Sequence, residues 1–587
     1  MRDRPRSVAD RDWSGRLQHG SNADRTRAES GPNAGRGEGG MVGGMATGAT
    51  PRGSGAQGGP GLSVVAGPPL AAISHLLDGP RIDHLLAHAA EEVPDRTALR
   101  SPYGDLTFAE LDEAATGCAR ALRAVLGGGG SVVALAMVLD PAFAVAFYGI
   151  SRSGNRSALV NPLLREDGLV HVLRACAARV AIVPPEVWRR LSAVADRLPD
   201  LELAVLTARD AGSEGAEAPP TLGELAGEAA GGPPPRARAD ETDVACVAFT
   251  SGTTGAAKGA RLTHRNLTVN AAQTVHGHRL GGTSVLFNFL PTFHLVHLNI
   301  GVLARAVHVL HPDGDVAGAV EAADAARATH FYSLPMRLAR LAADPRLPGL
   351  SAPALRVILS GGSALAPDTA DVLSQQFGVP VVQGYGLAET SPCTHLSDLD
   401  RPRAGSCGVP APGTECRIVD LGDGAVVPLG VDGEVQVRGP QLMSGYLGRD
   451  LALDVDAEGW FATGDVGRCD ADGSLFLVDR IKDVFKCDNW LVSPTQIERV
   501  LLRHPDVADC AVVDLPDEFS GAVAYGVVVP RGGTADAEAL MAYVNDRSPY
   551  YEHLRHVELV DELPKTGTGK VRRQELRERL RSRGRIG

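Results

Sequence analysis

The chain has 587 residues, more than one hydrophobic core usually organises, so several subdomains are expected. Lysine and arginine number 58 against 70 aspartates and glutamates, and the formal net charge of −12 argues against general nucleic-acid binding. Nine scattered cysteines without a Cys-x-x-Cys pair, and the absence of any run of about 18 apolar residues, favour a cytoplasmic protein with reduced thiols and no membrane span.

Residues 1–68 are rich in Gly, Arg, Ser, Ala and Asp and show almost no apolar periodicity. Such a segment buries too little apolar surface to offset the entropy lost on ordering. It also lacks the apolar region of a secretory signal peptide. We therefore expect a disordered N-terminal extension at 1–68, with the folded region starting near residue 69.

From residue 82 onward, the pattern alternates between strands and helices, which predicts mostly parallel sheets with helices on both faces. A segment rich in Gly, Pro, Glu and Ala interrupts the alternation at 211–239 and is expected to be a surface excursion. The elements expected before this segment are a helix at 82–90, a strand at 132–137, a helix at 141–150, a strand ending near 158–162, a helix at 171–178 and a strand at 180–183.

The second half of the chain resumes the alternation and then changes character. Short alternating runs between residues 405 and 446 predict a small antiparallel barrel or sheet. The predicted fold class is α/β: a large N-terminal domain of parallel-sheet subdomains plus a small barrel at 69–481, and a small α+β C-terminal domain at 482–587. The expected elements are strands at 285–290, 328–332, 357–360 and 433–438, a helix at 494–504, strands at 510–513 and 525–529, and a basic C-terminal helix.

A glycine- and threonine-rich loop at 250–259 follows an apolar run, 244–249, that predicts a buried strand. Glycines allow backbone N–H groups to surround an anion, hydroxyl groups add donors, and Lys258 supplies a full positive charge. The loop differs from a Walker A motif, because Gly255 is followed by Ala-Ala-Lys-Gly. It predicts a phosphate site, with a flexible surface loop as the alternative.

Further motifs suit the other parts of a nucleotide. Tyr385, flanked by glycines, could stack on a base, and Glu389 could bind Mg²⁺, which typically takes one or two carboxylates plus phosphate oxygens. The alternative is a tight turn with a solvated glutamate. Asp465 follows a turn and suits ribose hydroxyls, which Arg480 could also contact.

Two more residues complete the set of candidates. His294 ends an expected strand and either lines a pocket or has a structural role. Lys570 lies in a second glycine turn, 564–570, whose alternative interpretation is a mobile surface loop. Two lysine-bearing loops far apart in sequence make chemical sense if one binds leaving phosphates and the other neutralises charge at the reacting centre.

Together, in this order, the motifs resemble the adenylate-forming superfamily of acyl- and aryl-CoA synthetases, nonribosomal peptide adenylation domains and firefly luciferases, over about residues 80–575. The resemblance to the acyl-CoA ligase branch implies conversion of a carboxylic acid to its CoA thioester through an acyl-AMP intermediate. It implies ATP, Mg²⁺ and coenzyme A as cofactors. It also implies a mobile C-terminal domain that rotates between the two half-reactions about a hinge at Lys482.

The resemblance assigns roles by position. The nucleotide-binding residues would be Thr250, Ser251, Gly252, Thr253, Thr254, Lys258, Ser363, Gly384, Tyr385, Asp465 and Arg480. The metal ligands would be Glu389 and Thr254, and the acid-binding residues His294, Gly361 and Gly362. The catalytic residues would be Lys570 and His294, and the CoA-binding residues Lys486, Asn489 and Trp490.

Three positions depart from the family pattern. The family usually has Pro at Ala257, Thr at Ala388 and Gly at Asn489. The threonine hydroxyl would contact the reacting phosphate, and a hydrogen bond to a charged group is worth about 1.5–3 kcal/mol. One alternative is therefore a specialised enzyme with weakened adenylation that transfers a preformed acyl-adenylate to CoA. Another alternative is a non-catalytic ligand-binding relative, against which the retained Lys258, Glu389, Asp465 and Lys570 argue.

The sequence also indicates the class of acid and the acyl acceptor. In the related amino-acid adenylation domains, an aspartate near the His294 motif holds the α-ammonium; segment 293–298 has none, so the resemblance favours an acid without an α-amine. Small residues at 361–363 leave room for a bulky apolar or aromatic acid. No clear insertion follows the hinge and the chain ends soon after Lys570, which favours CoA over a carrier protein. The arginine-rich end has interleaved acids, so we expect a solvated helix face there and no RNA binding.

Overall fold

A computed structural model of the chain describes residues 61–77, 79–208, 210, 218–228, 235, 237, 240–250, 257–488, 490–517, 519–533, 535–565 and 571–582. Across these ranges no helix is both long and apolar enough to cross a bilayer. Residues 1–60 lie outside the description. The expected boundary at residue 68 is too late, because Val64–Ala66 forms strand β1, which pairs antiparallel with β18 (Glu415–Val419).

The first of two parallel sheets carries the glycine- and threonine-rich loop. Its six strands lie in the order β7-β6-β4-β5-β8-β9, and all are parallel except β9, which returns antiparallel to β8. The fully apolar interior of β8 makes it a buried strand, as predicted. The bounds are β4 Val132–Ala136, β5 Arg156–Val160, β6 Ala178–Val183, β7 Leu203–Leu206, β8 Val244–Phe249 and β9 Gly259–Thr263.

The second parallel sheet has seven strands in the order β14-β13-β12-β10-β11-β2-β3, with only β3 antiparallel. The carboxyl ends of β10, β13 and β14 lie at one edge, where open parallel sheets bind ligands. The bounds are β2 Thr97–Arg100, β3 Leu106–Thr107, β10 Val285–Phe289, β11 Val307–Leu310, β12 His330–Ser333, β13 Val357–Ser360 and β14 Val381–Gln383.

Helices cover both parallel sheets, and their ends follow from the local sequence. Thr107 and Glu110 form a capping box at the start of α2, and Asp140 caps α3 just before Pro141. The helices of this domain are α1 His84–Glu92, α2 Phe108–Leu126, α3 Pro141–Arg152, α4 Glu166–Ala175, α5 Pro185–Ser192, α6 Leu222–Glu228, α7 His264–Gly277, α8 Leu295–Leu303, α9 Val316–Ala325, α10 Pro335–Ala342 and α11 Pro367–Phe377.

Two antiparallel sheets complete the large domain. The segment predicted as a barrel or sheet belongs to a five-stranded sheet in the order β1-β18-β19-β20-β21, in which β19 has the predicted bounds. A three-stranded sheet, β15-β16-β17, begins at the predicted adenine-binding tyrosine. The remaining bounds are β15 Tyr385–Gly386, β16 Cys393–Leu396, β17 Val409–Pro410, β19 Gly433–Arg438, β20 Phe461–Cys469 and β21 Leu475–Arg480.

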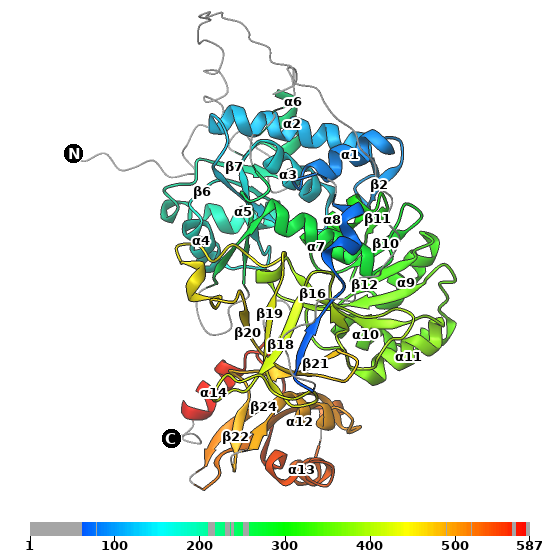
Figure 1. Cartoon of the computed structure of the whole chain (residues 1–587), viewed down its shortest axis with the longest axis vertical. Helices are drawn as coiled ribbons and strands as arrows, with labels where there is room; N and C mark the ends of the chain where they lie inside the picture. The colour runs from blue at the N-terminus through cyan, green and yellow to red at the C-terminus, as the bar shows by residue number, and fades with distance from the viewer. Residues whose placement is uncertain are drawn as a thin grey trace, which may run out of the picture.

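The C-terminal region has its own hydrophobic core, built from residues between 485 and 580. Its strands follow the order β23-β22-β25-β24, and β26 pairs parallel with β25. Figure 1 shows this domain, in orange and red, at one end of the molecule's long axis. Its elements are β22 Phe485–Cys487, β23 Trp490–Val492, α12 Pro494–Leu501, β24 Val507–Asp517, β25 Gly521–Pro530, α13 Ala537–Asn545, β26 Leu554–Leu559 and α14 Arg573–Ser582.

Two expectations about helices need correction. Helix α4 begins and ends earlier than the predicted 171–178, because Ala177 has a positive φ of 49° that ends the helix before β6. The expected surface excursion at 211–239 contains helix α6, whose Leu222 and Leu225 are buried. Gly117 of α2 packs against Ala226, which shows that α6 lies on α2.

Candidate active site

The predicted ribose-binding residues, Asp465 and Arg480, meet the predicted adenine-binding Tyr385, which lies 80 residues before Asp465. The hydroxyl of Tyr385 donates to Oδ2 of Asp465 over 2.5 Å, and Nε of Arg480 lies 2.6 Å from the other carboxylate oxygen. The register of β20 and β21 places Asp465 directly opposite Arg480. Burial, and then the Asp465 carboxylate, raise the pKa of Tyr385 well above its usual value, so the phenol stays a hydrogen donor.

The predicted metal ligand Glu389 is buried in the short helix Ala388–Thr390. Its Oε1 accepts a 2.6 Å hydrogen bond from the hydroxyl of Tyr446, and the Nζ atom of Lys258 lies 5.0 Å from the centre of the same ring. Burial, and then the carboxylate, raise the pKa of Tyr446. A tyrosine therefore joins the predicted magnesium ligand to the predicted phosphate-binding lysine.

Tyr446 was not among the predicted site residues. It is placed by residues 444–447, whose backbone pairs with β9: Leu447 N–H donates to Gly259 O, and Ser444 N–H donates to Arg261 O. The sequence does carry a signal, because Tyr446 follows a glycine, as Tyr385 does.

Glu389 fits a Mg²⁺ ion that also binds phosphate oxygens. The tyrosine hydroxyl binds Oε1 and holds the carboxylate in place, and Glu389 would be the protein ligand of the ion. Within the described ranges no cluster of three or more His, Cys, Asp and Glu side chains could hold a metal. Mg²⁺ typically takes one or two protein carboxylates when a nucleotide supplies further oxygens, so one buried glutamate is a sufficient protein ligand for this role.

The base of the predicted phosphate loop is closed by Thr250 and Lys258. Thr250 N–H donates to Lys258 O over 2.9 Å, and Lys258 N–H donates to Thr250 Oγ1 over 3.2 Å. The backbone bond lies one residue beyond the last ladder pair, Phe249 with Gly259, and together with the side-chain bond it fixes where the lysine leaves the sheet. Four other predicted loop residues lie outside the described residues: Ser251, Gly252, Thr253 and Thr254.

His294 joins β10 to α8 and caps that helix. Its Nδ1 accepts from Val296 N–H over 3.3 Å, so the neutral ring carries its hydrogen on Nε2. Burial lowers the pKa of His294 to about 4, which makes the imidazole neutral at pH 7. The ring can therefore offer an N–H donor to a carboxylate while it also serves as a helix cap.

The segment 361–363 follows β13 at the edge where β10 and β14 also end. Gly362 has a φ of 85°, and a side chain at Gly361 would meet no heavy atom within 4 Å. Ser363 is exposed. Gly384 follows β14, and a Cβ there would meet His395 O at 3.3 Å. This edge therefore has open space beside Gly361, whereas a Cβ at Gly362 would meet the Leu334 side chain at 3.8 Å.

Two of the predicted CoA-binding residues, Lys486 and Trp490, lie on the paired strands β22 and β23 of the C-terminal domain. Trp490 is 55% exposed and stacks on Tyr551, with ring centres 5.3 Å apart. Lys486 lies close enough to Asp420 to help lower the pKa of that carboxyl, although backbone hydrogen bonds contribute more. Asn489 and Lys570 lie outside the described residues.

The predicted hinge residue, Lys482, lies in the turn after β21, and burial lowers its pKa. Two carboxylates flank it. Before the hinge, Oδ2 of Asp479 accepts from Ser493 Oγ and Thr495 N–H, each over 2.9 Å, at the start of α12. After the hinge, Oδ2 of Asp483 lies 3.8 Å from Nη1 of Arg573, and Oδ1 of Asp483 lies 3.6 Å from Nη1 of Arg577; both arginines belong to α14.

Comparison with known proteins places this geometry in context. Residues 86–447 match the family model described as AMP-binding enzyme, and residues 496–570 match the AMP-binding enzyme C-terminal domain. A feruloyl-CoA synthase from Amycolatopsis sp. is 33% identical over 83% of this chain and 96% of its own length. An indoleacetate–CoA ligase from Aromatoleum aromaticum is 34% identical, over 84% of this chain and 96% of that protein.

The fold is also similar to that of a CoA ligase of known structure. The crystal structure of an anthranilate CoA ligase in complex with anthranoyl-AMP matches with a TM-score of 0.75 and 25% sequence identity. The match covers 85% of this chain and 97% of that one. The similarity therefore spans both the large domain and the C-terminal domain.

Proposed function

The chain belongs to the family of AMP-binding enzymes, and from this membership we propose that it activates a carboxylic acid with ATP and passes the acyl group to coenzyme A. It is an AMP-forming acid–thiol ligase that uses ATP, Mg²⁺ and CoA. The acyl-AMP intermediate, the class of acid and the roles of individual residues are our proposals.

One observation carries the proposal. Residues from five separate segments form two groups, Tyr385–Asp465–Arg480 and Glu389–Tyr446–Lys258, joined through the short stretch from Tyr385 to Glu389. The first group offers a carboxylate and a guanidinium for ribose hydroxyls. The second offers one cation and one carboxylate for metal-bound phosphates. This pairing suits a nucleoside triphosphate whose α-phosphate lies between the groups.

The chemistry follows from that placement. A carboxylate oxygen of the acid attacks the α-phosphorus of ATP, and the bond to the β-phosphate oxygen breaks to release pyrophosphate. Both reactants are anionic, so Lys258 lowers their repulsion, and Lys570 is proposed to do the same at the acyl carboxylate. Mg²⁺, held by Glu389, would neutralise further phosphate charge. The CoA thiol then loses its proton to solvent, its sulfur attacks the acyl carbon, and the bond from that carbon to the AMP oxygen breaks, so that AMP leaves.

His294 is proposed to orient the acid. Its Nε2–H is available because Nδ1 is occupied by the Val296 backbone, and its lowered pKa keeps this tautomer uncharged at pH 7. A neutral N–H donor holds a carboxylate in place and lowers its nucleophilicity less than a positively charged partner would. This role fits the position of His294 at the same sheet edge as Gly361.

We propose an aromatic acid without an α-amine as the substrate. The open space beside Gly361 leaves room for a ring, and segment 293–298 has no aspartate to bind an α-ammonium. The feruloyl-CoA synthase and the indoleacetate–CoA ligase that resemble this chain are named for aromatic acids. We also propose cytoplasmic localisation, because all nine cysteines are free.

A second candidate keeps the same fold and site but weakens the first step. Ala388 precedes Glu389 and has no hydroxyl to offer a phosphate. In this candidate, the enzyme transfers acyl groups from acyl-adenylates more efficiently than it forms them. The third candidate, a ligand-binding relative without catalysis, would bind ATP and release no pyrophosphate.

A screen of acids tests the proposed substrate class. The protein is incubated with MgATP, CoA and one acid at a time: ferulate, indoleacetate, anthranilate, octanoate or phenylalanine. We expect a CoA thioester and an equal amount of AMP from at least one aromatic acid, and none from phenylalanine. Thioester formation from octanoate alone would contradict the aromatic substrate, and ADP as the product would contradict the AMP-forming reaction.

A further inference from the structure

The peptide group between Ala257 and Lys258 is held at both ends. Its N–H, on Lys258, donates to Thr250 Oγ1 over 3.2 Å. Its carbonyl, on Ala257, lies 2.9 Å from Nε2 of His171. Because a carbonyl oxygen only accepts hydrogen bonds, Nε2 carries a hydrogen and is the donor.

His171 comes from a rigid part of the fold. It lies on α4, whose Leu169, Val172 and Leu173 are buried in the core between this helix and the six-stranded sheet. Its partner Ala257 is 86 residues later in the chain. The histidine therefore ties the exit of the phosphate loop to a helix that packing holds in place.

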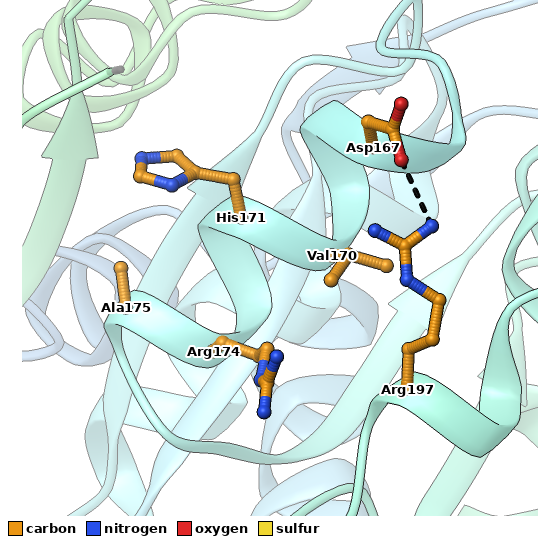
Figure 2. Close-up of a pocket in the computed structure, with 6 residues that line it drawn as sticks. All are labelled: Asp167, Val170, His171, Arg174, Ala175 and Arg197. Atoms are coloured by element: carbon orange, nitrogen blue, oxygen red, sulfur yellow. Dashed lines mark hydrogen bonds and ion pairs between the residues drawn. The ribbon is translucent and has the colours of Figure 1, made fainter.

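The surroundings of His171 leave the carbonyl as its partner. A surface pocket of about 500 Å³ lies along α4 and is lined by Asp167, Arg174 and Arg197 as well as His171. Figure 2 shows these side chains. Asp167 pairs with Arg197 over 2.8 Å, and the ring of His171 points away from that pair. The imidazole thus contacts the loop instead of the charged residues of the pocket.

Fixing this peptide plane fixes the lysine that follows it. The plane sets the direction in which Lys258 leaves the backbone, and the Lys258 Nζ atom lies 5.0 Å from the ring centre of Tyr446, which in turn holds Glu389. We propose that His171 is a positioning residue, which holds the Ala257 carbonyl so that Lys258 points at the β- and γ-phosphates of ATP. This inference rests on the proposed function.

The expected effect is selective for the nucleotide's outer phosphates. One net hydrogen bond corresponds to roughly a two- to tenfold change in an equilibrium constant. Removing the donor should weaken binding of MgATP by that factor. AMP has no β- or γ-phosphate and relies on the Tyr385–Asp465 group, so its binding should stay unchanged. A general folding defect would weaken both nucleotides.

Calorimetric titration of the full chain with MgATP and with AMP tests the proposal. His171→Leu removes the donor, and His171→Asn shortens the side chain beyond reach of the carbonyl, so both should weaken MgATP alone. His171→Gln places an amide N–H near the original Nε2 and should restore most of the affinity. Arg174→Ala, on the same helix and in the same pocket, is the matched control and should bind both nucleotides as the wild type does.

The titrations distinguish failure of the positioning role of His171 from failure of the proposed function. If His171→Leu misfolds, His171→Asn carries the same prediction with a polar side chain. Unchanged MgATP affinity in a folded donor-free variant, or equal weakening of MgATP and AMP, would overturn the positioning role. A wild-type protein that binds neither nucleotide would overturn the proposed function itself, which separates that failure from the failure of this inference.

Discussion

Tyr446 donates a 2.6 Å hydrogen bond to Oε1 of Glu389. The pair connects the segment after β19 to the short helix after β15, and Met443 N–H reinforces the connection by donating to the Glu389 carbonyl over 2.8 Å. A buried carboxylate without such a donor is costly, because it loses hydration and gains nothing in return. Tyr446 therefore fixes the orientation of the Glu389 carboxylate, which a metal ligand needs.

Replacing Tyr446 with Phe removes this donor and keeps the ring. A hydrogen bond to a charged group is worth about 1.5–3 kcal/mol, so we expect roughly a tenfold or greater loss in the rate of pyrophosphate release. The Mg²⁺ concentration for half-maximal rate should rise. Tyr103→Phe, at a residue 66% exposed, is the control and should leave both values unchanged. An unaltered Mg²⁺ dependence in Tyr446→Phe would contradict the role given to this tyrosine.

Replacing Asp465 with Asn tests the ribose site. The change removes the charge that pairs with Arg480 and leaves one acceptor oxygen in place of the two that Tyr385 and Arg480 use. Because AMP and ATP share the ribose, both should bind more weakly by a similar factor, roughly tenfold or more. Titration calorimetry with each nucleotide measures this. The control is Asp472→Asn, whose side chain is 77% exposed. Loss of ATP binding with full retention of AMP binding would rule out the ribose assignment.

Buried histidines make stability depend on pH. Burial lowers the pKa of His308 to about 3, and both ring nitrogens are buried without a hydrogen-bond partner among the described residues. Between pH 6.5 and pH 3 the unfolded chain binds a proton at this site that the folded chain does not, so stability is lost as the pH falls. At pH 5 the loss at such a site is about 2 kcal/mol.

His308→Leu should therefore reduce the fall in melting temperature between pH 7 and pH 5. Scanning calorimetry at both values measures the change. The exposed His75→Leu serves as the control and should show the wild-type pH dependence. If His308→Leu falls by as much as the wild type, the buried neutral state assigned to this ring is wrong.

The contact between Asp479 and α12 should act as a latch for the C-terminal domain. Asp479 precedes Lys482 in the chain, whereas Ser493 and Thr495 follow it, so rotation about the proposed hinge must break both hydrogen bonds. Asp479→Ala removes two bonds to a charged acceptor, and trypsin should cut the hinge several times faster. Asp368→Ala is the matched control. It removes an exposed ion pair, Oδ2 of Asp368 with Nε of Arg503 at 3.6 Å, and should leave the digestion rate near that of the wild type. Equal digestion rates for the wild type and Asp479→Ala would contradict the latch.

Local pattern was enough to predict many strands. The strands at 244–249, 357–360 and 433–438 have the predicted bounds, because unbroken apolar runs or strict alternation define them without tertiary context. Helix α4 was misplaced, since its first turn carries Glu166 and Asp167 and shows no apolar stripe. Strand β24 extends well beyond the predicted 510–513, because pairing with β25 continues through residues of low strand propensity.

Some residues of the candidate active site could be predicted from local sequence motifs, and others could not. Local motifs were enough to predict Tyr385, Asp465 and Arg480, because the residue types in those motifs indicate nucleotide binding. The structure brings the three side chains together. Tyr446 and His171 were not predicted, because their contacts depend on long-range placement of residues 444–447 beside β9 and of α4 beside the loop exit. No pattern within either segment specifies such a partner.

Acid-dependent release of pyrophosphate from MgATP in the absence of CoA tests the central claim most directly. With an acid that yields a thioester in the screen, we predict release of about one pyrophosphate per enzyme, followed by AMP release when CoA is added. Slow pyrophosphate release combined with fast thioester formation from synthetic acyl-AMP would favour the transfer-specialised candidate. Thioester formation without any acid-dependent pyrophosphate release would contradict the acyl-adenylate mechanism.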